Sequence, residues 1–216
     1  MTREELIKIV ALKMDEISSS DDVRVPVGTG DNNPLYTQIN SLINESINET
    51  LMKVPIYRIQ NQIGTMKVTS PIAVGGISRK AAVFTIPSDF IRLVQITDPL
   101  FKRPIVDLAV EGDDIDKKQH NKFLVAKYSK PVAVLGRGEA GRTITCYSYN
   151  DSDTPSATML YVKRYTTTSN TLDENIGLDD YMIDLVSWVC AGKVFAAQGD
   201  INKGKICDDN AAALMI

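Results

Sequence analysis

The chain has 216 residues, of which 44% are hydrophobic and 24% are charged, and its formal net charge is −3. This composition is typical of globular proteins and excludes the disordered and fibrous classes. No stretch approaches 18 uncharged apolar residues, so we expect no membrane-spanning helix. The slightly acidic balance also argues against a protein that coats nucleic acid.

The cysteines and the first residues indicate the compartment. Cys146, Cys190 and Cys207 are odd in number and widely spaced, and no apolar signal segment opens the sequence. Disulfides and secretory leaders are features of exported proteins, so we expect a protein of a reducing cytoplasm. The cysteine spacing matches no zinc motif, and no zinc site is predicted.

Two helices are predicted before residue 56. Thr2-Arg3-Glu4-Glu5 has the form of a capping box, and the apolar residues that follow recur at helical spacing to about Ile17. Residues 18–33 are polar and contain glycine, which predicts a long loop. Pro34 opens a second helix with an unbroken apolar stripe, and Pro55 stops it.

From Ile56 to Tyr165 the pattern changes to short runs of β-branched and aromatic residues separated by Gly, Pro, Asp and Asn. Such runs predict antiparallel strands. No helix of crossover length is expected between them, so a parallel doubly wound sheet is disfavoured. The expected strands are Ile56–Ile59, Ala81–Ile86, Ile91–Ile96, Phe123–Tyr128, Val132–Leu135, Arg142–Tyr149 and Met159–Tyr165.

Helical patterns return near the end of the sequence. Leu178–Gln198 is apolar on most sides and is predicted to be a buried helix ended by Gly199. Asp200 can cap a last helix through Leu214, which Gly204 weakens. We therefore predict an α+β fold with an inserted antiparallel β domain. Its helical bundle comprises residues 1–55 and 173–216, and its β region comprises residues 56–172.

Charge is divided along the chain. Its net value is −4 over residues 1–54, +6 over residues 55–172 and −5 over residues 173–216. Two interpretations stay open. Either each part presents a solvated surface, or separate faces meet separate partners or pack on each other across copies.

One glycine motif has the pattern of a dinucleotide-binding loop. Residues 136–141 read Gly-Arg-Gly-Glu-Ala-Gly and directly follow the expected strand Val132–Leu135. A dinucleotide fingerprint needs a helix N-terminus behind the glycines, because the helix meets the pyrophosphate. Residues 142–147 instead read as a strand, so we interpret the motif as a hairpin loop.

The candidate catalytic and metal-binding residues are few. His120 is the only histidine, and it stands in the polar run 117–122, where nothing is expected to bury or orient it. Residues 111–116 carry four carboxylates, but a calcium loop would need an oxygen ligand at Lys118 and a glycine at Gln119. The sequence therefore predicts no catalytic residue, no cofactor and no metal site.

Three stretches carry a resemblance to a known family. They are the helix end Leu51-Met52-Lys53-Val54-Pro55, the strand and turn Phe84–Leu93 with its Pro87-Ser88-Asp89-Phe90-Ile91-Arg92-Leu93, and the late helix Leu178–Asp200 with its Gly-Asp ending. In order and spacing they resemble the head-to-tail adaptor proteins of tailed phages, including the tail-tubular and ring proteins of crAss-like phages. The resemblance covers nearly the whole chain. Gly204 departs from it, because a strong helix is expected there.

The resemblance implies a structural protein of the virion, located at the head–tail junction and assembled in the cytoplasm of the bacterial host. It implies a homo-oligomeric ring of about a dozen copies that binds the portal protein and tail proteins. It also implies that packaged DNA passes through the lumen without sequence-specific binding. No reaction and no membrane are involved. An acidic channel wall would avoid holding the DNA phosphates.

Two sets of residues are the candidate contacts. Leu214, Met215 and Ile216 are apolar and are expected at a free end that inserts into the portal. Arg137, Glu139 and Arg142 are expected on a tail-facing loop. The alternatives are another virion or surface interaction protein, or a small ligand-binding or enzymatic β domain.

Overall fold

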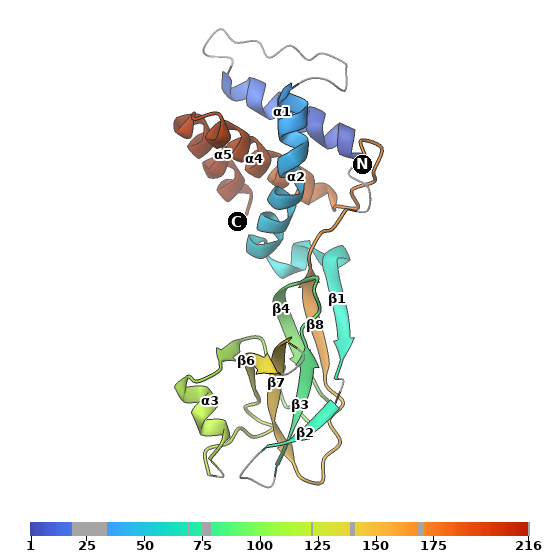
Figure 1. The fold of residues 1–216 in the computed structure, drawn as a ribbon, viewed down its shortest axis with the longest axis vertical. Helices are drawn as coiled ribbons and strands as arrows, with labels where there is room; N and C mark the ends of the chain where they lie inside the picture. Colours follow the sequence, from blue (N-terminus) through green and yellow to red (C-terminus); the bar gives the residue numbers. More distant parts are fainter. Residues whose placement is uncertain are drawn as a thin grey trace. The chain divides into compact units, whose positions relative to one another are not determined.

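The computed structural model describes residues 1–18, 34–68, 70–74, 79–121, 123–138, 141–167 and 171–215. The chain divides into two compact units: a helical unit, Met1–Gln62 with Arg164–Ile216, and a β unit, Ile63–Lys163. Helices from both ends of the sequence form the first unit, and strands from its middle form the second (Figure 1). The predicted α+β fold is confirmed. Apart from Ser18, the loop predicted at residues 18–33 lies outside the described residues.

Within its described residues the helical unit contains four α-helices and two short 3₁₀ helices. They are α1 (Arg3–Ser18), α2 (Pro34–Lys53), η1 (Ile56–Arg58), η2 (Gln60–Gln62), α4 (Asp180–Ala197) and α5 (Ile201–Leu214).

The ends of these helices follow from local chemistry. Thr2 and Glu5 form the predicted capping box, with the Thr2 N–H donating to Glu5 Oε2 at 2.7 Å and the Glu5 N–H donating to Thr2 Oγ1 at 3.2 Å. Pro34 is the first residue of α2. Gly199 follows α4 with a φ of +86°, and Asp200 caps α5 by accepting from the Lys203 N–H at 3.1 Å.

The core of the helical unit lies where the apolar stripes of α1 and α2 pack with α4. Each stripe recurs at spacings of three and four residues, as an amphipathic helix requires. Burying each of these side chains contributes about 1.5–3 kcal/mol. The fully buried members include Leu6, Val10, Ile39, Ile43, Ile47, Leu51, Leu185, Val186 and Val194.

Arg3 is the largest fully buried side chain among the residues that the structure describes. Its guanidinium donates to the Asn40 side chain, to Asn44 Oδ1 at 2.9 Å and to the Asn40 carbonyl at 2.9 Å, and it lies 3.7 Å from Glu174 Oε2. A charge is tolerated in a core only when it is paired and hydrogen-bonded. Arg3 therefore ties α1 to α2 and to the segment before α4.

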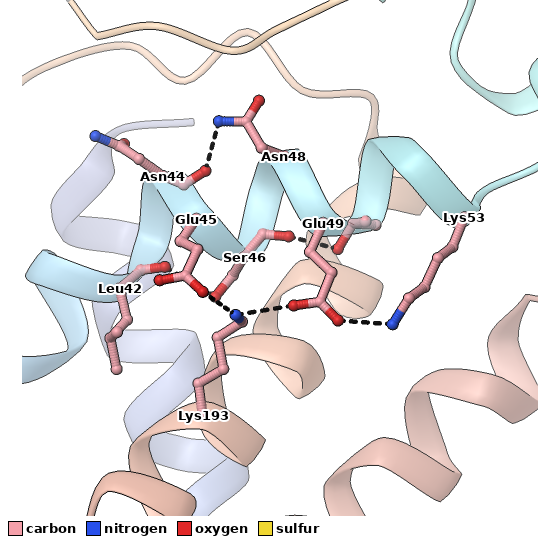
Figure 2. A network of polar contacts seen from close by, with 9 residues as sticks. Leu42, Asn44, Glu45, Ser46, Asn48, Glu49, Lys53 and Lys193 are labelled. Carbon is pink, nitrogen blue, oxygen red and sulfur yellow. Dashed lines mark hydrogen bonds and ion pairs between the residues drawn. The ribbon is translucent and has the colours of Figure 1, made fainter. Parts of the chain in front are cut away.

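A polar network on the surface joins α2 to α4, as Figure 2 shows. Lys193 Nζ of α4 lies 2.8 Å from Glu49 Oε2 and also pairs with Glu45. Glu49 in turn pairs with Lys53 at 2.6 Å, four residues further along α2. One lysine thus bridges two carboxylates on consecutive turns of the neighbouring helix.

Gly204, which was expected to weaken the last helix, is buried where α5 packs on α4, and α5 runs through it without interruption. A Cβ atom at Gly204 would lie 3.2 Å from the carbonyl oxygen of Gly192. The glycine pair lets the two helix backbones approach closely. The local loss of helix propensity is offset by packing.

The β unit contains two sheets (Figure 1). The three-stranded sheet is antiparallel and has the order β1 (Ile63–Lys67), β8 (Thr158–Lys163), β4 (Phe90–Thr97). The five-stranded sheet has the order β2 (Ser70–Ala73), β3 (Arg79–Thr85), β7 (Gly141–Asn150), β6 (Val132–Gly138), β5 (Leu108–Val110). The main core of the β unit takes residues from both sheets. Its fully buried members include Phe84, Ile96, Ile144, Cys146, Tyr149 and Met159.

Several expected elements are corrected by the structure. Residues Ile56–Ile59 form the 3₁₀ turn η1 rather than a strand, because they follow Pro55 and bond within the turn. Phe123–Tyr128 is a turn region in which Asn121 Oδ1 accepts from the Phe123 N–H at 2.9 Å. β5 pairs with β6 in parallel, so the second sheet is mixed. The short helix α3 (Asp114–Gln119) was not expected.

None of the helices in the described part of the chain combines the length and the apolar character needed to cross a bilayer.

Candidate functional site

The glycine motif forms the predicted hairpin between β6 and β7. Gly138 pairs with Gly141 at its end, and Arg137 pairs with Arg142 one step further in. Gly141 has a φ of +118°, which a glycine adopts without strain. Both arginines are exposed. Of the three residues expected on this loop, the structure brings Arg137 and Arg142 together, while Glu139 lies outside the described residues.

Contacts on both sides fix the position of this hairpin. Glu111 Oε2, from the turn after β5, accepts a hydrogen bond from the Arg137 N–H at 2.9 Å. A Cβ atom at Gly136 would stand 2.8 Å from that same oxygen, so the glycine makes room for the carboxylate. On the other strand the Ile86 N–H donates to the Arg142 carbonyl at 2.9 Å. Hydrogen bonds on both strands therefore hold the backbone of the two arginines in place.

Arg137 and Arg142 stand directly opposite each other in the strand register and carry the same charge. Residues directly opposite across an antiparallel pair have their Cβ atoms about 4.5–5.5 Å apart, and like charges there are destabilising. No carboxylate of the described residues lies within ion-pair distance of either arginine. An anionic group from a partner would relieve this repulsion and could be held by both side chains. The hairpin can thus bind an acidic surface.

His120 is more constrained than the sequence predicted. Its Nε2 lies 3.6 Å from Asp116 Oδ1, and its ring meets that of Tyr147 edge-on with the centroids 6.0 Å apart. Glu111 and Arg137 line the same cavity of about 160 Å³. His120 is exposed, as expected, but a carboxylate does lie beside it, because His120 is the C-cap of α3 and Asp116 precedes it by four residues in that helix.

The chemistry of this cavity is limited. At 3.6 Å the imidazole and the Asp116 carboxylate are too far apart for a hydrogen bond, and Asp116 Oδ2 instead accepts from the Gly112 N–H at 2.9 Å. Burial, with the nearby charges of Asp116 and Glu111, raises the pKa of Tyr147, so its hydroxyl keeps its proton at neutral pH. These groups offer a hydrogen-bonding surface beside the hairpin.

The expected portal contact lies in a different setting from the one predicted. Residues 211–214 belong to α5, and Ala211 is buried. The Leu214 carbonyl accepts hydrogen bonds from Tyr181 and, at 3.1 Å, from Arg58. The last turn of α5 is therefore tied to its own unit through Leu214, and the portal contact expected of Leu214 and Met215 stays a prediction. Ile216 lies outside the described residues.

Sequence reasoning missed α3 and the anchoring role of Glu111. A signal was present, since Asp113 caps the helix by accepting from the Asp116 N–H at 2.7 Å, which is the pattern of an N-cap. The acidic run does not fit a calcium loop, and its Asp113 instead begins a helix. Glu111 contacts residues 26 positions away, which no local pattern reveals.

The cysteines and carboxylates offer no reactive or metal-binding group in the described residues. Cys146, Cys190 and Cys207 are free and buried. Burial raises the pKa of Cys190 to about 11 and that of Cys207 to about 12, so both remain unreactive thiols near neutral pH. No cluster of three or more His, Cys, Asp or Glu suited to a metal ion occurs in the described ranges.

No protein-family model matches this chain, and no curated protein is significantly similar to it in sequence.

Proposed function

We propose that the protein is a structural component of a tailed-phage virion that forms a ring adaptor between the portal and the tail and lines the DNA channel. The proposal starts from the family resemblance of the sequence. The observation that carries it is the agreement between the charge division and the structural division of the chain.

The two units carry opposite net charge. The helical unit contains 10 basic and 17 acidic residues, a net charge of −7, and the β unit contains 14 basic and 10 acidic residues, a net charge of +4. The balance within the units differs too. In the helical unit Lys8, Lys13, Lys53 and Lys193 all pair with carboxylates, whereas among the described lysines of the β unit Lys117 alone does so.

Opposite net charges on the two units of one subunit favour a heterologous contact, in which the acidic unit of one copy meets the basic unit of the next. A heterologous contact repeated with a closing rotation generates a ring. Subunits that carried one sign of charge throughout would repel each other. The hairpin arginines are then available for a tail protein with an acidic surface.

The test is particle size, measured by light scattering with negative-stain images, for the protein alone and with the portal protein of the same genome. We expect a closed ring, formed alone or only on the portal, that weakens as salt is raised from 50 to 500 mM, because screening reduces contacts between exposed charges. A lasting monomer that ignores the portal at low salt would overturn the proposal. A ring whose stability does not change with salt would contradict the inference that opposite charges hold the copies together.

A further inference from the structure

A cluster of cations surrounds one tight turn of the β unit, away from the hairpin arginines in sequence. Lys127 and Lys130 pair across the turn, with the Lys130 N–H donating to the Lys127 carbonyl at 2.9 Å. The Lys102 N–H donates to the Tyr128 carbonyl at 2.9 Å, which brings a third lysine beside the turn. We call Lys102, Lys127 and Lys130, together with Arg79, the basic turn.

Arg79 reaches this turn from β3. Its Nη1 donates to the Ala126 carbonyl at 3.3 Å, which holds the guanidinium next to Lys127. Arg79 and Lys127 line one cavity of about 220 Å³, together with Tyr128, Ser148 and Asn150. Two basic residues therefore line the same hollow, and the other three residues that line it have polar side chains.

Ser148 adds an independent observation. It is the one non-glycine residue of the described chain with a positive φ, 111°, and it lies where the register of β7 against β3 shifts. Its side chain is 1% exposed, and its hydroxyl has no hydrogen-bond partner among the described residues. Strained backbone and an unsatisfied buried hydroxyl cluster at functional positions in proteins.

The acidic groups nearby do not neutralise the cations. Asp153 contacts two of the residues that line the cavity, since its Oδ2 accepts from the Asn150 N–H at 2.6 Å and from the Tyr128 hydroxyl. Lys80 approaches the backbone of the same residue, with its Nζ donating to the Asp153 carbonyl at 3.1 Å. No cation of the basic turn forms an ion pair with a described carboxylate.

We infer that the basic turn is a binding site for a phosphate group, held by Arg79 and Lys127, which line the cavity, while Lys102 and Lys130, whose backbones bond to the same turn, add positive charge. Guanidinium and ammonium donors around a hollow suit a tetrahedral oxyanion, and positive charges that converge without carboxylates gain most from such a ligand. Two sources supply this chemistry: the backbone of duplex DNA, or a small free phosphate. The assignment of DNA as the source of the phosphate group depends on the proposed function.

The test measures binding of a short fluorescent DNA duplex by anisotropy at several salt concentrations. The variant is Lys127→Gln with Lys130→Gln. The control is Lys67→Gln with Lys118→Gln, which removes the same charge from exposed positions elsewhere in the β unit. We expect the variant to bind about tenfold more weakly and its slope of log K against log salt to fall by about 2, while the control changes binding less than about threefold.

A second arm adds inorganic phosphate at constant ionic strength and follows the backbone NMR signals of Lys127 and Lys130. Saturable shifts that disappear in the Lys127→Gln variant support the site, and displacement of the duplex by phosphate identifies DNA and phosphate as ligands of the same place. Shifts without duplex binding identify a small phosphate as the source. The absence of both responses, or an equal loss in the control, overturns the inference.

Ring assembly is measured separately on the same variants. A variant that still forms rings but loses duplex binding supports the inference independently of the ring. If the wild-type protein binds phosphate here but stays monomeric with the portal, the site stands and the adaptor proposal fails. Lys127 and Lys130 are both exposed, so we expect the variants to fold, and thermal melting followed by circular dichroism checks this for each variant.

Discussion

Gly64 of β1 and Tyr161 of β8 are paired in register, and the tyrosine ring covers the glycine. A Cβ atom at Gly64 would stand 2.7 Å from Cζ of Tyr161. The ring is held at the start of β4: it stacks on Phe90, the first residue of that strand, with centroids 5.7 Å apart, and its hydroxyl donates to Asp89 Oδ1 at 3.2 Å. Asp89 and Phe90 of the resemblance motif thus hold the tyrosine ring that shields a glycine on an edge strand.

The first prediction replaces this glycine. Gly64→Ala places a methyl group inside the contact distance of the Tyr161 ring, so we expect the free energy of unfolding to fall by about 1–3 kcal/mol. Urea unfolding measures it. In the Tyr161→Leu background the same change should cost less, because the ring that it strikes is gone. Equal costs in both backgrounds would show that the ring does not constrain Gly64.

The second prediction concerns the bridge between α2 and α4 (Figure 2). Lys193→Met removes the ammonium shared by Glu45 and Glu49. We expect the free energy of unfolding at pH 7 to fall by up to about 1 kcal/mol, because the pairs are partly exposed and screened. Lys8→Met, which breaks a pair within α1, is the control and should cost less.

The pH dependence of this effect has a definite sign. Hydrogen bonds from Lys193 and Lys53 hold the pKa of Glu49 below its ordinary value of 4.5. A carboxyl whose pKa is lowered by folding contributes stability above its unfolded pKa, and that stability is lost as the pH falls through the folded pKa. The difference between wild type and Lys193→Met should therefore be full at pH 7 and shrink below about pH 4.5. A constant difference down to pH 3 would contradict the pairing.

The parts of the fold that depend on local chemistry were predictable from the sequence. The capping box at Thr2 and Glu5, the glycine end of α4 and the Asp200 cap each involve residues within a few positions of one another. The hairpin at Gly138 and Gly141 is equally local. Such elements are decided before any long-range contact forms, so pattern reasoning finds them.

The features that the sequence did not predict depend instead on contacts between residues far apart in the chain. Gly204 reads as a weak point in a helix until Gly192, twelve residues away, is placed against it. Arg79 meets the turn at Ala126 across 47 residues of sequence. The cations of the basic turn look scattered along strands because the β3–β7 pairing and the turn after α3 bring them together only in the folded chain. Tertiary contacts of this kind leave no periodic signal.

The third prediction tests the hairpin pair. Arg142→Thr removes one of two opposed positive charges and places a β-branched residue on the strand, so we expect stability to rise by about 0.2–1 kcal/mol. Thermal or urea unfolding measures the change at low and high salt. The gain should shrink at high salt, where the repulsion is already screened. Loss of stability at low salt would show that the two charges are not in conflict.

The same positions test the proposed tail contact. Arg137→Ala with Arg142→Ala should weaken attachment of an acidic tail protein, because both guanidinium groups lack a described carboxylate partner. Attachment is measured by pull-down with the tail proteins of the same genome. Lys67→Gln with Lys118→Gln serves as a control for lost charge. Unchanged attachment in the arginine variant would remove the hairpin from the tail-facing surface.

The last prediction concerns the packing of α4 on α5. A Cβ atom at Gly192 would lie 3.1 Å from Asp208 Oδ1, 3.3 Å from Cys207 Cβ and 3.3 Å from the Gly204 carbonyl. Alanine raises helix propensity by about 1 kcal/mol over glycine, whereas overpacking a tight interface costs about 1–3 kcal/mol.

Because two of the three neighbours are a backbone atom and a buried Cβ, we expect the steric cost to exceed the gain in helix propensity, so that Gly192→Ala destabilises the protein. Gly177→Ala is the control, since nothing lies within 4 Å of its Cβ position, and it should leave the urea midpoint almost unchanged. A higher midpoint for Gly192→Ala would mean that α5 shifts outward at little cost, and the close approach at Gly204 would then not be what fixes the two helices together.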